Sequence, residues 1–476
     1  MSAAQSTIFA LSSGRPPAAI AVVRISGPKA GAALQALIGR VPEPRKATLA
    51  RVRDPHSGEV IDEGLALWFP GPRSETGQDT VELQLHGGQA VITGVLDALS
   101  TIDGCRLAEP GEFTRRAFEN GRLDLTAVEG LADLIAAQTP AQRRLAFRQL
   151  KGLIGDRAED WRRRLTAALA LVEARIDFSD EADVPQDLVR PALAAARQLR
   201  AEVVESLADC GRGERLREGL VVAIAGPPNA GKSALLNRLA RREAAIVSPH
   251  PGTTRDVIEV HLDLFGYPVT LLDTAGIRDS DDPVEREGVR RARDRAAAAD
   301  LVLWVTDASV GGGRAGQDEA WAAKPIAAEV WLLRNKADLI ADEPQCQDES
   351  GCKNKSNRSF TISARTGRGM DRFVAALATY ATDYFATTES ALITRARHRR
   401  ALQETVAALD RALAHDQLAH DEDESVHDQS AHDRGAGEEL IAEDLRAAAM
   451  ALGRLTGRVD VEDILDVIFR DFCIGK

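Results

Sequence analysis

The chain has 476 residues, a length that predicts about three domains. Its formal net charge is −12 and 44% of its residues are hydrophobic, so sizeable cores are expected and a generally basic nucleic-acid binder is excluded. Any contact with RNA must therefore use a local basic patch. The five cysteines form no Cys-x-x-Cys pair, which predicts a reducing, cytoplasmic location. We find no signal peptide and no run of ~18 apolar residues, so membrane insertion is not expected.

Residues 1–120 have the pattern of a mixed α/β domain. Apolar runs and alternating side chains predict strands over residues 19–25, 64–69 and 80–86. Apolar residues at helical spacing predict helices over residues 30–38 and 88–99.

Residues 121–216 and 381–476 have helical patterns and flank a different segment, residues 217–380. The first helical segment predicts helices over residues 127–138, 140–153, 156–178 and 191–216. Because the helical pattern returns after residue 380, we expect one all-α domain interrupted by an inserted domain. Helices from both sides of the insertion would then share one core.

The inserted segment opens with a complete phosphate-binding loop, residues 226–233. It follows a predicted buried strand, 220–225, and precedes a predicted helix, 234–239, which is the context that the motif requires. Its glycines let successive backbone N–H groups point at phosphate. Lys232 would reach the terminal phosphates and Ser233 would bind Mg²⁺. The nucleotide contacts predicted here are Asn229, Ala230, Gly231, Lys232, Ser233 and Ala234.

The downstream motifs predict that the nucleotide is GTP. The Asp338 carboxylate can accept hydrogen bonds from two adjacent guanine N–H groups, which adenine does not present, and unpaired buried polar groups discriminate strongly against the wrong base. Asn335 and Lys336 would brace the base and the phosphate loop. A backbone contact to the guanine oxygen is expected after the predicted strand 360–362. The residues predicted to recognise guanine are Asn335, Lys336, Ala337, Asp338, Ser363, Ala364 and Arg365.

Two further motifs would complete the nucleotide and Mg²⁺ site. Asp273 ends a predicted strand and would hold Mg²⁺ through water, while the Gly276 N–H would sense the γ-phosphate. Thr254 is the predicted switch threonine for Mg²⁺. The predicted nucleotide contacts in these motifs are Asp273, Thr274, Ala275, Gly276, Ser248, Pro249, His250, Pro251, Gly252, Thr253 and Thr254.

Hydrolysis needs groups that Ras-like proteins supply differently. Ile277 stands where such proteins carry the Gln that positions the attacking water, and it cannot hydrogen-bond water. Asn229 is a candidate ligand for K⁺, which could do the electrostatic work of an arginine finger. Glu285 is a candidate for orienting water, with an exposed surface charge as the alternative.

Two polar segments, residues 345–359 and 415–437, interrupt the pattern. The first predicts an exposed loop. The second repeats His-Asp at residues 415, 420, 427 and 432. Metal binding is conceivable there because some His and Asp residues have i,i+4 spacing. We favour a solvated insertion between two helices because the segment is too polar to pack.

The chain ends Phe472-Cys473-Ile474-Gly475-Lys476 behind a helical domain that hosts a GTPase segment. With the Gly-Thr-Thr-Arg-Asp switch at 252–256 and Val-Arg-Ile-Ser-Gly at 23–27, it resembles the MnmE (TrmE) family of tRNA modification GTPases, which belong to the TrmE-Era type. The resemblance covers the whole chain apart from the two polar segments.

The resemblance implies a K⁺-stimulated GTPase that works with a flavoprotein, MnmG (GidA), in a heterotetramer or larger complex. The pair adds an aminomethyl or carboxymethylaminomethyl group to C5 of the wobble uridine, position 34, of certain tRNAs. The carbon would come from 5,10-methylene- or formyl-tetrahydrofolate bound by the N-terminal domain. That domain would be similar to folate-binding domains and would form a homodimer.

The resemblance also assigns residues. Arg24, Glu82, Arg122 and Lys476 match folate contacts, although the family often has Lys at the position of Arg122. The positions that match K⁺ ligands are Asn229, Ser248, His250 and Thr253. Glu285 matches the residue that positions catalytic water; Lys232, which would reach the terminal phosphates, is a further catalytic candidate. Cys473 is a candidate catalytic thiol, with simple packing as the alternative.

Two other functions remain open from the sequence. One is a GTPase switch of ribosome assembly, which would need an RNA-binding module with a basic surface. The arginine runs at 143–144, 162–164 and 395–400 are interleaved with apolar residues and are more simply solvated helix faces. The other is a folate-dependent transferase in which the GTPase segment acts only as a clamp.

Overall fold

The chain folds as two compact units in the computed structural model. The first unit comprises residues 1–132, 148–203 and 400–476, and the second comprises residues 133–147 and 204–399. The residues that the structure describes are 6–178, 188–208, 210–227, 229–242, 245–246, 259–273, 299–309, 329–340, 358–386, 392–423, 431–459, 468–469 and 475. The domain boundaries predicted at residues 120, 216 and 380 stay a prediction.

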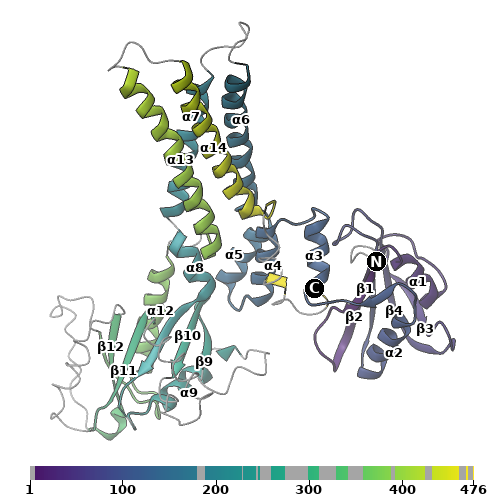
Figure 1. Cartoon of the computed structure of the whole chain (residues 1–476). Helices are drawn as coiled ribbons and strands as arrows, with labels where there is room; N and C mark the ends of the chain where they lie inside the picture. Colours follow the sequence, from purple (N-terminus) through teal and green to yellow (C-terminus); the bar gives the residue numbers. More distant parts are fainter. Residues whose placement is uncertain are drawn as a thin grey trace, which may run out of the picture. The chain divides into compact units, whose positions relative to one another are not determined.

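The first unit begins with a six-stranded sheet of order β3-β4-β5-β2-β1-β6 (Figure 1). Its strands are β1 (Thr7–Leu11), β2 (Ala18–Ser26), β3 (Thr48–Arg53), β4 (Val60–Phe69), β5 (Thr80–Gly87) and β6 (Cys105–Leu107). Helices α1 (Ala30–Ile38) and α2 (Gln89–Ser100) pack on one face. Alternate side chains, such as Val23 and Ile25, are buried against them. The α/β pattern predicted for this region is confirmed.

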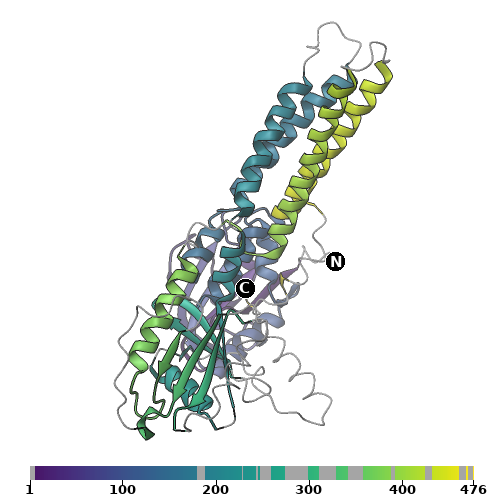
Figure 2. The same ribbon diagram turned by 90° about the vertical axis from the view of Figure 1, so that its left-hand side faces the viewer.

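The rest of the first unit is mainly helical. Helix α6 packs against α14, and Arg446 of α14 bonds Glu173 of α6 at 2.9 Å. Figures 1 and 2 show α6, α7, α13 and α14 side by side. Helices from before and after the inserted segment therefore pack together, as predicted. The helices of this region are α3 (Glu112–Glu119), α4 (Leu125–Ala136), α6 (Gly155–Asp177), α7 (Val189–Ala208), α13 (Ala396–Asp423) and α14 (Ala431–Thr456). Most of α5 (Pro140–Leu150) belongs to the second unit, where Ala141 and Leu145 join the core.

The second unit contains a seven-stranded sheet of order β13-β12-β11-β7-β10-β9-β8. The five strands from β13 to β10 are parallel, and β9 and β8 are antiparallel additions. The strands are β7 (Leu220–Ala225), β8 (Ala245–Ile246), β9 (Glu259–Leu264), β10 (Tyr267–Asp273), β11 (Leu301–Asp307), β12 (Glu329–Asn335) and β13 (Ser359–Thr361). The helices in its described residues include α8 (Cys210–Glu218), α9 (Lys232–Arg242), α12 (Met370–Phe385) and the 3-10 turn η3 (Ala337–Leu339).

Parallel strands place their carboxyl ends at one edge of a sheet, where α/β proteins bind ligands. The phosphate loop follows β7, Asp273 ends β10, and Asn335 ends β12. The strand pairing therefore collects the predicted nucleotide motifs at the same edge.

The helical pattern predicted over 191–216 is confirmed by two helices, α7 and α8. Two other sequence expectations need correction. The His-Asp segment is not simply a loop between helices, because α13 continues to Asp423 and α14 begins at Ala431. Within it, His415 Nε2 lies 3.3 Å from Asp444 Oδ2. Of the loop predicted over 345–359, residues 345–357 lie outside the described residues, and Ser359 begins β13.

Among the described residues, none of the helices combines the length and the apolar composition that a membrane crossing requires.

Candidate functional site

The phosphate loop lies between β7 and α9, and Lys232 is its central cation. Its ammonium donates to the carbonyl oxygens of Gly226 at 2.8 Å and Pro227 at 2.9 Å. Burial lowers the pKa of Lys232, and the nearby charge of Asp273 opposes that shift. The loop thus holds the lysine over the concave backbone where successive N–H groups can bind an anion.

Ser233 and Asp273 meet at the start of α9. Ser233 Oγ donates to Asp273 Oδ2 at 3.1 Å, and the Asp273 side chain is buried at the end of β10. A hydroxyl and a carboxylate together are oxygen ligands of the kind that Mg²⁺ prefers. The structure therefore brings together the two described residues that the sequence predicts for magnesium.

Asn335 joins the phosphate loop to the guanine loop. Its side chain is 2% exposed; Nδ2 donates to the Ala230 carbonyl at 2.9 Å, and Oδ1 accepts from the Ala364 N–H at 3.0 Å. This is the bracing role predicted for Asn335. Of the segment 363–365, which is predicted to make the backbone contact to the guanine oxygen, the Ala364 N–H is engaged by Asn335.

Gly231 makes this bridge possible. Its φ is +90°, and a Cβ built there would lie 2.3 Å from Asn335 Nδ2. Any larger residue would displace the amide that holds Ala230 and Ala364.

Asp338 follows Asn335 at the predicted base-recognition position. Its Oδ1 accepts from Ser363 Oγ at 2.6 Å, and its Oδ2 lies 4.0 Å from Arg365 Nε. The hydrogen bond from Ser363 is the largest cause that holds the pKa of Asp338 below its usual value. The carboxylate is therefore ionised at neutral pH and available as an acceptor. Ala337, between these residues, is buried.

Lys336 has a partner that the sequence motifs did not reveal. Its Nζ bonds Asp307 Oδ2 at 2.6 Å. Burial alone would raise the pKa of Asp307, but hydrogen bonds from Lys336 and Ser309 outweigh it and lower the pKa. Asp307 ends β11, so its position at the carboxyl edge of a parallel strand was a usable signal.

Asn229 is exposed and has a φ of 63°, a left-handed conformation that Asn tolerates better than most residues. The remaining predicted nucleotide residues lie outside the described residues: Ser248, Pro249, His250, Pro251, Gly252, Thr253, Thr254, Thr274, Ala275, Gly276 and Glu285. Ala234 is described and exposed in the first turn of α9.

In the first unit, the structure pairs two of the predicted folate residues with each other. Arg24 donates to Glu82 Oε1 through Nε at 3.1 Å and through Nη2 at 2.9 Å. Arg24 Nη1 also lies 2.7 Å from Glu75, and its guanidinium lies 5.8 Å from the centroid of the Phe113 ring. Glu75 and Phe113 were not predicted, because no local pattern marks either one. Arg122 is exposed.

The end of the chain contacts the N-terminal sheet. Ser12 Oγ donates to the Gly475 carbonyl at 2.7 Å, and a Cβ on Gly475 would lie 2.1 Å from the Leu11 carbonyl oxygen. Gly475 has a φ of +100°, so both its conformation and its surroundings require glycine. The neighbouring candidates Cys473 and Lys476 lie outside the described residues.

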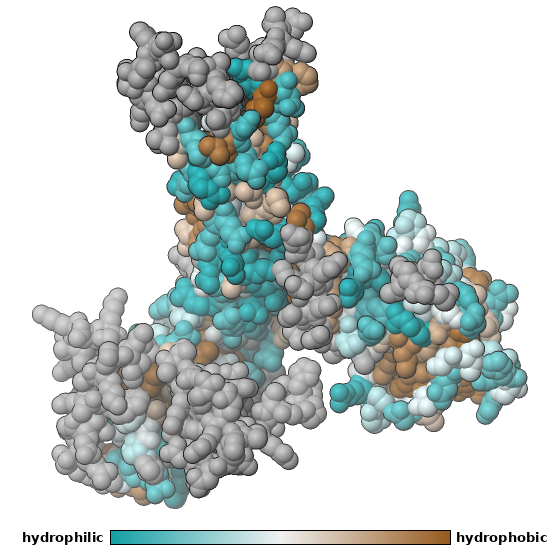
Figure 3. Space-filling model, viewed as in Figure 1, coloured by the Kyte–Doolittle hydropathy of each residue, from teal (hydrophilic) through white to brown (hydrophobic). Residues whose placement is uncertain are grey.

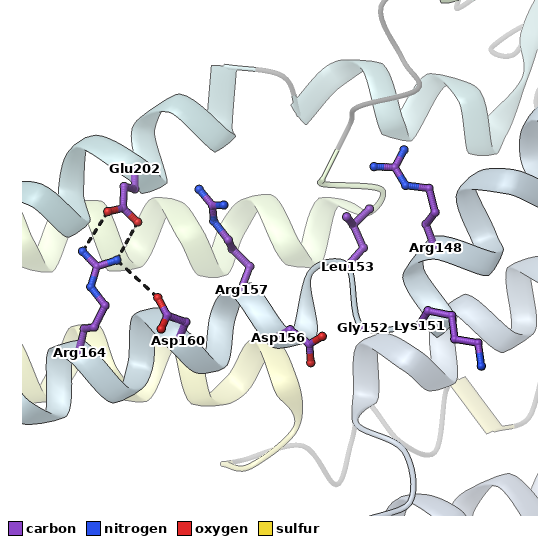
Figure 4. Close-up of a pocket in the computed structure, with 9 residues that line it drawn as sticks. All are labelled: Arg148, Lys151, Gly152, Leu153, Asp156, Arg157, Asp160, Arg164 and Glu202. Carbon is purple, nitrogen blue, oxygen red and sulfur yellow. Dashed lines mark hydrogen bonds and ion pairs between the residues drawn. The ribbon is translucent and has the colours of Figure 1, made fainter.

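A separate hollow of about 730 Å³ lies among the helices of the first unit. Figure 4 shows Arg164 bonded to Glu202 of α7 and to Asp160, with Lys151 pointing away from Arg148 and Arg157. Carboxylates within this hollow compensate part of its positive charge.

Two protein-family models match this chain. The model of the GTP-binding protein TrmE N-terminus matches residues 7–122, and that of the MnmE helical domain matches residues 125–473. The tRNA modification GTPase MnmE of Bradyrhizobium sp. strain BTAi1 is 58% identical over 99% of both chains. That of Rhodopseudomonas palustris strain BisB18 is 56% identical over 100% of both chains. The chain belongs to the MnmE family of tRNA modification GTPases. It is accordingly an enzyme of the GTP-hydrolysing class, with GTP as its substrate.

Among solved structures, the chain is similar to the G domain of the T. maritima FeoB iron transporter. The two are 26% identical, over 35% of this chain and 98% of that chain, with a TM-score of 0.25. This score is too low to add to the family assignment.

We expect Gly231→Ala to weaken GTP binding roughly 10- to 100-fold, because displacing Asn335 leaves buried polar groups unpaired. Gly266→Ala is the matched control: Gly266 also has a φ of +90°, but a Cβ added there would meet no atom within 4 Å. Fluorescent-nucleotide titration of both variants measures the difference. Equal losses of affinity would show that backbone strain, and not the Asn335 bridge, is what matters.

Proposed function

We propose that this family member is the GTP-hydrolysing subunit of a complex that modifies C5 of the wobble uridine, position 34, in certain tRNAs. The group added is aminomethyl or carboxymethylaminomethyl. A folate one-carbon carrier supplies the carbon, and a flavoprotein of the MnmG (GidA) type is the partner. The observation that carries the proposal is the joining of a phosphate loop to a guanine-recognition loop by Asn335, in a chain of this family. Ribosome assembly, the alternative, has no such support from the relatives.

The described residues of the nucleotide site support a particular way of binding GTP. Backbone N–H groups at the start of α9 and the Lys232 ammonium bind the phosphates. Ser233 and Asp273 would hold Mg²⁺, which supplies charge neutralisation for the phosphates when bound. The ionised Asp338 accepts from the guanine N–H groups, while Ser363 fixes its orientation. Asn335 keeps the two loops at a constant separation.

Hydrolysis depends on K⁺ and on Glu285 in this proposal. Asn229 stands in the loop with its side chain exposed, so its oxygen can face a monovalent cation beside the phosphates. Ser248, His250 and Thr253 are the other proposed K⁺ ligands, Thr254 is a proposed Mg²⁺ ligand, and Glu285 orients the water.

We expect turnover to rise with K⁺ but not with Na⁺ at matched ionic strength, since only the larger ion would complete the site. Glu285→Ala should lower kcat by about 100-fold while leaving GTP affinity nearly unchanged, as loss of a positioned catalytic group does. Steady-state phosphate release and nucleotide titration provide the two measurements. Equal rates in K⁺ and Na⁺ would contradict the K⁺ assignment. Loss of GTP binding in Glu285→Ala would show that Glu285 has a structural role.

The folate assignment rests on the face of the sheet that carries Arg24 and Glu82. Arg24 is 16% exposed and is paired with two carboxylates, Glu75 and Glu82, so the cluster is not simply a cation for a folate carboxylate tail. Its exposed carboxylate oxygens suit the N–H donors of a pterin-like ring. The exposed Arg122 and the terminal Lys476 would then meet the tail. Gly475 secures the terminal segment to β1, and we propose that this brings Cys473 and Lys476 to that site.

Exposed apolar side chains on the same sheet support the proposed homodimer. Cross-strand pairing aligns Leu49, Leu65, Gln84 and Val22 across four strands, on the face opposite α1 and α2. Helix α3 covers only part of this face, through Phe113 in a buried cluster near β1. Leu49 and Leu65 are not covered: they are 61% and 37% exposed in the described part of this unit. Figure 3 shows a hydrophobic area on the surface of the N-terminal α/β part. We propose that a second copy of the chain covers this face.

We expect Leu65→Glu to weaken the dimer more than ~100-fold, because it would bury an unpaired carboxylate in the interface. Leu107→Glu is the matched control, since Leu107 is 56% exposed and pairs with Phe9, which faces the helices. Sedimentation velocity over a concentration series reports both. A Leu65→Glu chain that stays dimeric would place the interface elsewhere.

Nucleoside mass spectrometry of tRNA tests the function as a whole. Cells that lack this chain should lose the C5-aminomethyl-type uridines, and the unaltered chain should restore them. Arg24→Ala should fail to restore them while the purified variant hydrolyses GTP at the normal rate, because Arg24 belongs to the other unit. Unchanged nucleosides in the deletion strain would overturn the proposed function. Full restoration by Arg24→Ala would overturn only the folate assignment.

A further inference from the structure

The second unit has an arginine-lined hollow beside the guanine loop. Its volume is about 600 Å³, and it opens to solvent. Its described lining residues are Ala234, Asn237, Arg238, Arg241, Ala364 and Arg365. Three are arginines and none is acidic.

The hollow extends beyond the place where the GTP phosphates bind. Ala234, Asn237, Arg238 and Arg241 have the i, i+3, i+4, i+7 spacing of a single helix face on α9. Arg241 follows Ser233 by eight residues, which is about 12 Å at the rise of an α-helix. The phosphates bind at the first turn, so an occupant near Arg241 cannot be the nucleotide's own phosphate chain.

Two of the arginines also hold the guanine loop. Arg238 donates to the Arg365 carbonyl at 3.3 Å and to the Thr366 carbonyl at 3.4 Å. The Arg365 side chain is 84% exposed, and its Nε lies 4.0 Å from Asp338. An anion that attracts these guanidinium groups competes with long, weak contacts to the loop. Occupancy of the hollow is thereby linked to guanine recognition.

We propose that this hollow binds the phosphodiester backbone of an RNA and couples that binding to nucleotide affinity. This inference rests on the proposed function, which makes tRNA the substrate. Guanidinium forks match phosphate oxygens in a bidentate manner. A chain of net charge −12 needs a local basic cluster to hold a polyanion. An open hollow lets a polymer pass through it.

The arginine runs that the sequence offered as other RNA surfaces are largely paired with carboxylates. Their ion pairs include Arg162–Glu159, Arg163–Asp160, Arg164–Glu202, Arg395–Asp133, Arg399–Glu214 and Arg400–Glu404. Of the three arginines that line the α9 hollow, Arg365 lies 4.0 Å from Asp338, whereas Arg238 and Arg241 have no ion pair among the described residues. Local positive charge therefore favours the hollow over the runs.

Arg241→Ala tests the hollow and preserves the hydrogen bonds from α9 to the guanine loop, because those bonds come from Arg238. Arg372→Ala is the matched control, since Arg372 is an exposed arginine of α12 in the same unit and lies outside the described lining of the hollow. Fluorescence anisotropy with labelled tRNA and the full chain measures affinity over a salt series. We expect Arg241→Ala to weaken binding roughly three- to tenfold and to lower the salt slope by about one, with the control near the parent.

A second titration tests the coupling. Saturating tRNA should change the affinity of the parent chain for fluorescent GDP several-fold, and the affinity for tRNA must then change by the same factor when GDP is bound. Arg241→Ala should bind GDP normally without tRNA and should need roughly three- to tenfold more tRNA to produce the same change, because the coupling contacts of Arg238 and Arg365 remain.

The opposite outcomes overturn the inference. Parent-like tRNA affinity and salt slope in Arg241→Ala, or no tRNA binding by the parent chain, would remove RNA from this hollow. If only binding to the flavoprotein partner weakens, the hollow is a protein-docking site. The nucleoside test remains separate: restoration of the modified uridines by Arg241→Ala, together with parent-like tRNA binding, leaves the proposed function standing and rejects only this site.

Discussion

The buried amide of Asn335 is the contact on which the nucleotide site depends. One side chain donates to the phosphate loop through Nδ2 and accepts from the guanine loop through Oδ1. Both bonds are buried, so losing either would leave an unpaired polar group, at a cost of about 1–3 kcal/mol. This side chain therefore fixes the separation of the base end and the phosphate end of the site from inside the protein, while Arg238 joins α9 to the guanine loop at the surface. Gly231 has to be glycine because the amide occupies the space of its side chain.

Much of this site could be predicted from the sequence, because the chemistry of phosphate and guanine recognition fixes residue types at short spacing. The phosphate loop, Asp273 and the 335–338 motif each stand at or directly after the end of a strand, and parallel pairing then brings them to one edge. The strands and helices flanking the phosphate loop were predictable for the same reason, since buried strands give continuous apolar runs.

The contacts that could not be predicted from the sequence join residues far apart in the chain. Gly475 and Ser12 are separated by 463 positions, and nothing near either one indicates the other. Glu75 reaches Arg24 from a polar segment that carries no motif. The sequence analysis missed the extension of α13 and α14 into the His-Asp segment for a different reason. Low complexity and high polarity usually oppose packing. A helix makes its backbone hydrogen bonds internally, however, so it can extend beyond a packed region.

The second unit also ties together the two connections of the nucleotide segment. Arg217 of α8 donates to the Thr394 carbonyl at 3.1 Å, and Glu214 of α8 pairs with Arg399 of α13 at 3.0 Å. The chain segments that enter and leave the nucleotide-binding part are therefore bonded to each other.

Tyr384 of α12 connects α8 to the sheet, because the Arg215 guanidinium of α8 lies 5.0 Å from the centroid of its ring. Its hydroxyl donates to Asp300 Oδ1 at 2.6 Å, and Asp300 Oδ2 accepts from the N–H of Val221 in β7. Burial and the Asp300 hydrogen bond raise the pKa of Tyr384, so it remains a neutral donor throughout the physiological range. Strand β7 leads directly into the phosphate loop. A displacement of that loop along β7 would therefore act on the entering and leaving helices together, because separate movement of either would break Arg217–Thr394 or Glu214–Arg399.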